Sequence, residues 1–277
     1  MPYGIANPHG QVDLSEGAAI IQRACEAGID TLDTAVSYGD SEINLGKIGV
    51  ANWRVVSKLP QLPDSTDATT WVRRQVVESL NRLNVESLYA LLIHHPAALL
   101  GPDGAALYEA IVGAKNEGLV SKIGISVYGP EEIDEISSLF LIDIVQAPFS
   151  IVDRRLITSG CLERMAEKGI ELHVRSVFLQ GLLLMDRLHR PADFERWDKL
   201  WAKWHDWLLQ AQLTPLQACL GFVASRQGVH RLVIGVDSCA QLEQILAAMD
   251  LAQALTFPEE LACQDPQLIN PSNWSPH

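Results

Sequence analysis

Four side chains that could together donate a proton to a carbonyl group stand at the ends of three successive predicted strands. Asp33 and Tyr38 lie in IDTLDTAVSYG, Lys58 lies in RVVSKLP, and His94 lies in YALLIHHP. A phenol has an ordinary pKa of about 10, too high for ready proton donation, but a nearby cationic lysine favours the phenolate. A carboxylate would hold the lysine in place, and an imidazole could orient the carbonyl oxygen. The set predicts a general acid that needs a hydride-carrying cofactor.

Each of these residues also has a structural interpretation when it is taken alone. A strand-end aspartate can cap a helix, a loop tyrosine can pack, and a lysine can extend to solvent. Lys58 could instead be a Schiff-base nucleophile in an aldolase-like barrel, although Asp33 and Tyr38 fit a proton donor better. If the expected register of this strand is wrong by one residue, His95 takes the role expected of His94. We expect no metal, because no further His or Cys stands at ligand spacing.

Short apolar runs that alternate with amphipathic stretches must position these residues, and this alternation predicts a parallel sheet with covering helices. Several of the runs are apolar on both faces, as expected of buried parallel strands. The predicted strands are 30–33, 55–58, 89–94, 122–126, 142–147, 171–176 and 231–235. The predicted helices are 14–27, 67–83, 105–116, 130–139, 157–168, 215–225 and 240–252.

The fold predicted from this order is an α/β (β/α)8 TIM barrel formed as one domain over residues 1–277. No GxGxxG motif stands at a first strand–helix turn, which argues against a Rossmann fold. The segment before the first helix, MPYGIANPHGQVD, is typical of a loop, so the barrel is expected to lack its first strand. A weak strand hidden there is the alternative. A helical insertion is expected at about 191–212 and a C-terminal tail at about 253–277.

Charge and composition narrow the classes of partner. The formal net charge of −13 disfavours nucleic acid and anionic membranes. Five scattered cysteines and the lack of a signal-like or long apolar run favour the cytoplasm. A tryptophan stripe in the insertion (Trp197, Trp201, Trp204 and Trp207) is expected to pack on the barrel. A subunit contact through Trp197, Trp201 and Trp204 is the alternative.

The motifs that carry these residues resemble those of the aldo-keto reductases. DTAVSYGDSEINLG is similar to the family segment with the catalytic Asp and Tyr, SKLP to that with the Lys, and LLIHHP to that with the His. KIGISVYGPEEI, DIVQAPFSIVD, RSVFLQGLLL and LVIGVDSCAQLEQIL follow in family order, so that the likeness runs from about Gly4 to about Met249. LINPSNW, together with PYGIAN, resembles a subset linked to polysaccharide and nucleotide-sugar pathways.

The resemblance implies an NAD(P)H-dependent reduction of an aldehyde, ketone or sugar. Tyr38 would donate the proton, Lys58 would lower its pKa, Asp33 would pair with Lys58, and His94 would orient the carbonyl. Residues implied in cofactor binding are Ser126, Gln146, Arg175, Ser176, Gly235, Asp237, Ser238, Gln241 and Gln244.

Two departures from the family pattern affect the cofactor. Arg175 replaces the tyrosine that commonly stacks on the nicotinamide. Asp237 stands where basic residues often hold a 2′-phosphate, and a carboxylate there would repel a phosphate and could accept from a free 2′-hydroxyl. The family favours NADPH, and this local charge leaves NADH open. A protein that binds the cofactor as a sensor or assembly partner, without catalysis, is the alternative function.

Overall fold

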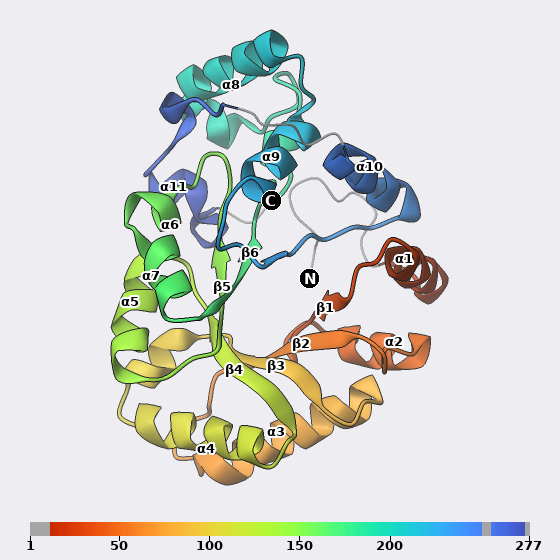
Figure 1. Ribbon diagram of the computed structural model, residues 1–277, viewed down its shortest axis with the longest axis vertical. Coiled ribbons are helices and arrows are strands. Elements are labelled where there is room, and N and C mark those ends of the chain that lie inside the picture. The colour runs from red at the N-terminus through yellow and green to blue at the C-terminus, as the bar shows by residue number, and fades with distance from the viewer. Residues whose placement is uncertain (1–11, 251–255, 275–277) are drawn as a thin grey trace.

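Seven parallel strands form a single curved sheet whose order follows the chain (Figure 1). The structure is a computed structural model that describes residues 12–250 and 256–274. The strands are β1 (Thr31–Asp33), β2 (Arg54–Leu59), β3 (Leu88–Ile93), β4 (Val120–Ser126), β5 (Ile144–Pro148), β6 (Glu171–Arg175) and β7 (Arg231–Leu232). All seven predicted strands are therefore present, and β7 is shorter than the sequence predicts.

Helices surround the sheet on its outer side, as Figure 1 shows. They are α1 (Leu14–Glu26), α2 (Ser41–Ile48), α3 (Ala68–Leu83), α4 (Gly104–Asn116), α5 (Pro130–Leu139), α6 (Arg155–Thr158), α7 (Cys161–Glu167), α8 (Asp198–Ala211), α9 (Pro215–Ala224), α10 (Cys239–Asp250) and α11 (Pro266–Ile269). Helix α2 was not predicted, and the single helix predicted over 157–168 is divided at Gly160, whose φ is 69°.

The strand register gathers the candidate site residues at one end of the sheet. Lys58 pairs with Leu92 of β3, and Ser126 pairs with Gln146 of β5. Because all the strands are parallel, their carboxyl ends lie on the same side, where barrels carry their functional loops. Asp33 and Arg175 are the last residues of β1 and β6.

The two outer strands of the described sheet, β1 and β7, do not pair with each other within residues 12–250. Side chains bridge them instead: Arg231 donates to Asp30 Oδ2 at 3.1 Å and to Thr31 Oγ1 at 3.3 Å. Helices α1 and α10 pack across the same interval. The sequence predicts that the first strand of the barrel is absent. Residues 1–11, which this prediction concerns, lie outside the described residues.

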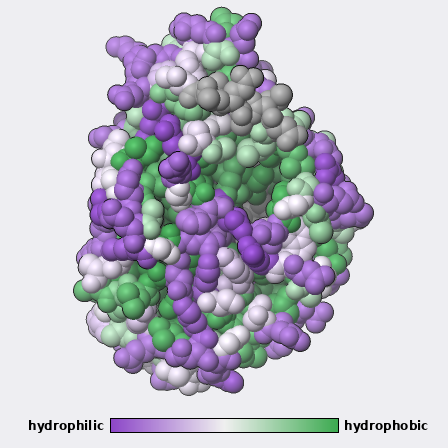
Figure 2. All heavy atoms as spheres, in the orientation of Figure 1, coloured by the Kyte–Doolittle hydropathy of each residue, from purple (hydrophilic) through white to green (hydrophobic). Residues whose placement is uncertain are grey.

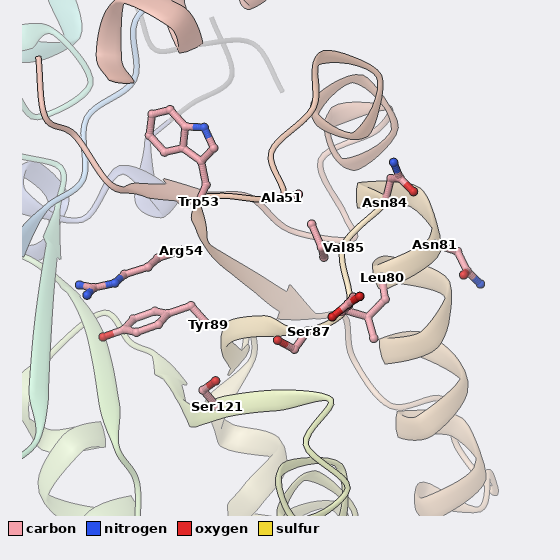
Figure 3. A pocket seen from close by; sticks show the side chains of 11 residues that line it. Ala51, Trp53, Arg54, Leu80, Asn81, Asn84, Val85, Ser87, Tyr89 and Ser121 are labelled. Carbon is pink, nitrogen blue, oxygen red and sulfur yellow. The ribbon is translucent and has the colours of Figure 1, made fainter. Parts of the chain in front are cut away.

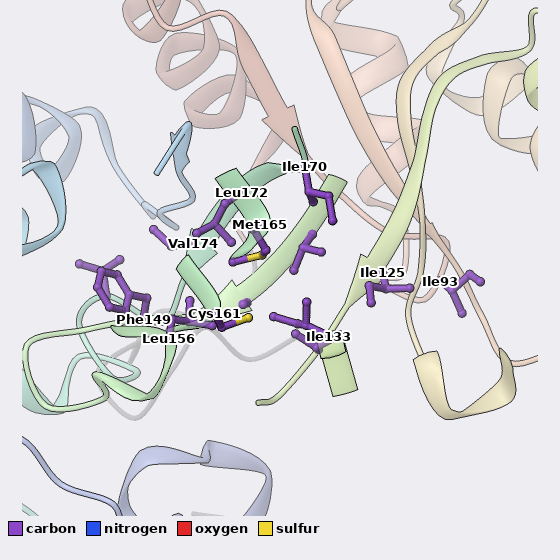
Figure 4. Packing of buried hydrophobic residues seen from close by; sticks show 14 of the residues in the cluster. Ile93, Ile125, Ile133, Phe149, Leu156, Cys161, Met165, Ile170, Leu172 and Val174 are labelled. Atoms are coloured by element: carbon purple, nitrogen blue, oxygen red, sulfur yellow. The ribbon is translucent and has the colours of Figure 1, made fainter. Parts of the chain in front are cut away.

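The main hydrophobic core lies between the sheet and its helices. Figure 4 shows side chains of β3–β6 packed with those of α5 and α7, including Ile133 and Met165. A smaller cluster inside the sheet's curve contains Val56, Ala90, Leu92 and Ile144. Because the strands are buried on both faces of the sheet, their sequences are continuous apolar runs.

The tryptophan stripe is packed within the chain. Trp201 and Trp204 are fully buried, and their indole nitrogens donate to Phe194 O at 2.9 Å and Leu183 O at 3.3 Å. These two side chains are therefore covered within the chain, while a subunit contact through the face that includes Trp197 stays a prediction. Trp197 is partly buried and donates to Asp265 of the tail at 3.2 Å.

The face in Figure 2 carries polar side chains around much of its periphery and a further polar group near its middle, with hydrophobic side chains between them. None of the helices in the described part of the chain is long and apolar enough to cross a membrane.

Candidate active site

A buried ion pair between Lys58 and Asp33 forms the centre of the candidate site. Lys58 Nζ lies 2.6 Å from Asp33 Oδ1 and 2.8 Å from the Thr34 carbonyl oxygen. The Lys58 side chain is 0 % exposed and that of Asp33 is 15 % exposed. Burial lowers the pKa of Lys58, and the Asp33 carboxylate opposes this shift. Both acceptors favour the charged ammonium, which suits an electrostatic role better than nucleophilic attack.

Tyr38 lies in the loop after β1, close to this lysine. Lys58 Nζ is 5.2 Å from the centroid of the Tyr38 ring, and the Tyr38 and His94 rings meet edge to face at 5.7 Å. The predicted set from three different strands is thus brought together: Asp33, Tyr38, Lys58 and His94 lie at the carboxyl end of the sheet. His95 lies beside His94 at 5.4 Å but is exposed.

Glu42 is a supporting residue that the sequence analysis did not single out. Its carboxylate is 2 % exposed and accepts from Ser57 Oγ at 2.6 Å, Ser79 Oγ at 3.0 Å and Arg82 Nε at 2.7 Å. These bonds tie α2 to β2 and α3 and so fix the far end of the loop that holds Tyr38. The only sequence signal was an acidic residue in the first turn of an unpredicted helix.

His94 follows β3 directly and is neutral at physiological pH. Burial, reinforced by the positive charge of Lys58, lowers the pKa of His94 to about 4. Its Nδ1 is buried without a hydrogen-bond partner among the described residues. A neutral imidazole can donate one hydrogen bond to a substrate oxygen without delivering a full charge.

We expect the imidazole of His94 to titrate near pH 4 rather than at the ordinary value of about 6.5. The folded state favours the neutral form, so this residue's contribution to stability is complete above about pH 6.5 and falls as the pH drops towards about 4. NMR titration of the histidine C–H resonances, with His94→Asn to identify the signal, measures it. A midpoint near pH 6.5 would contradict the burial argument.

The residues predicted to hold the nicotinamide carboxamide lie next to this set. Ser126 and Gln146 are adjacent in the register of β4 and β5 and are both buried. Gln146 Nε2 donates to Asp33 Oδ2 at 2.7 Å, which links the carboxamide-binding candidates to the ion pair. Ser176, after β6, has a φ of 60° and accepts a bond from Arg175 at 3.3 Å.

The residues predicted at the adenosine end surround the start of α10. Asp237 N donates to Gln241 Oε1 at 2.8 Å, and Gln241 N donates to Ser238 Oγ at 3.3 Å. Gly235, Gln241 and Gln244 are exposed. Glu16 of α1, which the sequence analysis missed, accepts from Cys239 N at 2.7 Å and places a carboxylate at the first turn of α10.

A second polar cluster lies at the amino end of the strands. Glu171 accepts from Tyr89 at 2.7 Å and from Lys122, and it lies 2.8 Å from His173 Nε2. Burial would raise the pKa of Glu171, but these three hydrogen bonds outweigh it and lower the pKa to about 2. The cluster is a network of ion pairs and hydrogen bonds in which His173 Nδ1 is left without a partner in the described part of the chain. No group of three potential ligands that could hold a metal occurs among the described residues.

A cavity of about 670 Å³ also lies at the amino end of the strands (Figure 3). Its lining includes Arg54, the first residue of β2, with Tyr89 near the start of β3 and Ser121 near the start of β4. Lys58 and His94 lie at the other ends of β2 and β3. This cavity is therefore separate from the proton-donor set.

Comparisons with known proteins point to one family. The sequence model of the Aldo/keto reductase family matches residues 2–256. The NADH-specific methylglyoxal reductase of Escherichia coli is 23 % identical, covering 88 % of this chain and 85 % of that protein. The human aflatoxin B1 aldehyde reductase member 2 is 23 % identical, with 87 % and 79 % covered. The holo form of an aldo-keto reductase from Bacillus halodurans superposes with a TM-score of 0.73 at 22 % identity, covering 89 % of this chain and 85 % of that one.

Proposed function

The chain belongs to the aldo/keto reductase family, and on this premise we propose that it reduces an aldehyde, ketone or sugar carbonyl to an alcohol with Tyr38 as the general acid. Membership makes it an NAD(P)-dependent oxidoreductase. The observation that carries the assignment of Tyr38 is the position of Lys58 Nζ, 2.6 Å from Asp33 and 5.2 Å from the Tyr38 ring centroid. A fixed cation at that place stabilises negative charge on the phenol.

In the proposed mechanism, Tyr38 donates its hydroxyl proton to the carbonyl oxygen as negative charge develops there. Lys58 stabilises the resulting phenolate, and Asp33 keeps Lys58 protonated and in place. His94, neutral and beside the Tyr38 ring, donates a hydrogen bond that orients the carbonyl. The nicotinamide cofactor supplies the hydride.

The side chains at the mouth fit a nicotinamide. Ser126 and Gln146 present a hydroxyl and an amide from neighbouring register positions, which match the donor and acceptor of a carboxamide. Arg175 and Ser176 border the same region from the end of β6. We place the adenosine end against Gly235, Asp237 and Ser238, and against the exposed Gln241 and Gln244.

We propose that the chain prefers NADH. Glu16 and Asp237 place two carboxylates at the start of α10, where a 2′-phosphate would be repelled. Arg23, further along α1, is already paired with Glu243. The name of the Escherichia coli relative, an NADH-specific reductase, points the same way.

Titrating the protein with NADH and NADPH, with tryptophan fluorescence as the signal, should give a Kd at least about tenfold lower for NADH. Glu16→Gln should tighten NADPH binding and leave NADH binding unchanged within about threefold. Glu26→Gln, at the exposed end of α1, is the matched control. Tighter binding of NADPH to the wild-type protein would overturn the proposed preference.

The function itself is tested by following NADH oxidation with a panel of aldehydes, ketones and sugars. Turnover above the rate without enzyme supports it. Saturable cofactor binding with no turnover on any carbonyl would instead support the non-catalytic sensor or assembly protein.

A further inference from the structure

The mouth of the barrel holds an arginine, Arg175, that forms no ion pair with a carboxylate among the described residues, although the charges of Asp33 and Glu132 act on it from a greater distance. Arg175 is the last residue of β6 and is partly buried. Its guanidinium donates to the Val127 carbonyl oxygen at 2.9 Å and to Ser176 Oγ at 3.3 Å, and it lies 4.9 Å from the centroid of the Tyr128 ring. These partners are neutral. Within the described residues, Arg175 forms no ion pair.

The charge of Arg175 acts on the residues proposed to carry the reaction. Burial is the main cause that lowers the pKa values of Lys58 and His94, and the positive charge of Arg175 lowers both further. The one carboxylate in this set, Asp33, is already bound to Lys58 and Gln146. The set therefore contains two cationic side chains and one anionic one, inside a protein whose net charge is −13.

We propose that Arg175 binds an anionic group, a carboxylate or a phosphate, on the carbonyl substrate. The inference rests on the proposed function, because it names the substrate class of that same site. A guanidinium has five N–H donors in a planar fork that matches these oxyanions, and the two hydrogen bonds it makes within the chain leave donors to spare. A partly desolvated cation in a cleft attracts anions strongly. The substrates expected are oxo acids, aldehyde acids and phosphorylated or acidic sugars.

The test compares two aldehydes of equal chain length, 4-oxobutanoate and butanal. For the wild-type protein we expect the higher kcat/KM with 4-oxobutanoate. In Arg175→Gln the ratio of the two kcat/KM values should fall about 10–100-fold, because the charge-assisted hydrogen bonds serve only the anionic substrate. Arg175→Lys keeps the positive charge but lacks the planar guanidinium, so its ratio should lie between those of the wild-type protein and Arg175→Gln. Arg187→Gln, an exposed arginine of the following loop, removes the same charge and should leave the ratio unchanged.

Phosphate groups of the cofactor are the other source of such an anion, and the same variants distinguish it. If Arg175→Gln weakens cofactor binding and slows both aldehydes equally, the ratio is unchanged and the assignment to the substrate is overturned. A ratio also cancels any general loss of folded protein, which circular dichroism of the variants measures directly.

A second measurement does not depend on turnover. Calorimetric titration with oxalate should detect binding to the wild-type protein and to Arg187→Gln but not to Arg175→Gln. That result supports the anion site even if the protein reduces no carbonyl. In that case the proposed function is overturned and the anion site is not. Equal binding of oxalate to all three proteins, or to none, would overturn the inference.

Discussion

Replacing Tyr38 by Phe is expected to lower kcat by about 10²–10⁴-fold, the usual contribution of a positioned general acid. The substitution removes only the hydroxyl, so the ring contact with His94 and the position of Lys58 beside the ring can persist. The cofactor Kd should change by less than about threefold, because the loss concerns proton transfer and not ground-state binding.

Steady-state kinetics and a parallel fluorescence titration measure these two quantities. Tyr108→Phe is the matched control: Tyr108 belongs to α4, and its hydroxyl donates to the Leu141 carbonyl oxygen at 2.9 Å. It should leave kcat unchanged within about threefold. Undiminished turnover in Tyr38→Phe would remove Tyr38 from its proposed role, whatever the family assignment.

The positions of the candidate catalytic side chains at the strand ends could be predicted, because buried parallel strands are continuous apolar runs and a polar residue at the carboxyl end stands out. Lys58 and His94 each follow such a run, and the parallel order then brings their side chains to one mouth. Strand β7 was overextended in the prediction, since the sequence after Leu232 stays apolar although its ladder with β6 ends there.

Contacts between distant segments could not be predicted. Glu42 is satisfied by residues of β2 and α3, and Glu16 caps a helix more than two hundred residues away in the chain. From the sequence, Arg175 was a candidate for cofactor binding and a departure from the family pattern. Its significance depends on partners from other elements, Val127 and Tyr128, and on its forming no ion pair among the described residues.

The pair formed by Lys58 and Asp33 should be essential for activity and also costly to break. Asp33→Asn leaves a fully buried lysine without its counter-ion and should lower the free energy of unfolding by about 3 kcal/mol. Lys58→Met should cost less, because the remaining carboxylate is 15 % exposed and keeps its bond from Gln146. Each single variant should lose at least about 100-fold in kcat.

The double variant Asp33→Asn/Lys58→Met separates stability from catalysis. With both charges removed, the loss of stability should be smaller than the sum of the single losses by about 1–3 kcal/mol, as urea denaturation can measure. Activity should not return, since the variant lacks Lys58, the cation that lies 5.2 Å from the Tyr38 ring centroid and is proposed to stabilise the phenolate. Asp134→Asn breaks an exposed ion pair with Arg164 and should cost less than about 1 kcal/mol. Strictly additive losses would mean that the buried pair is not coupled in solution, and retained turnover in the double variant would mean that the proton donor does not need Lys58.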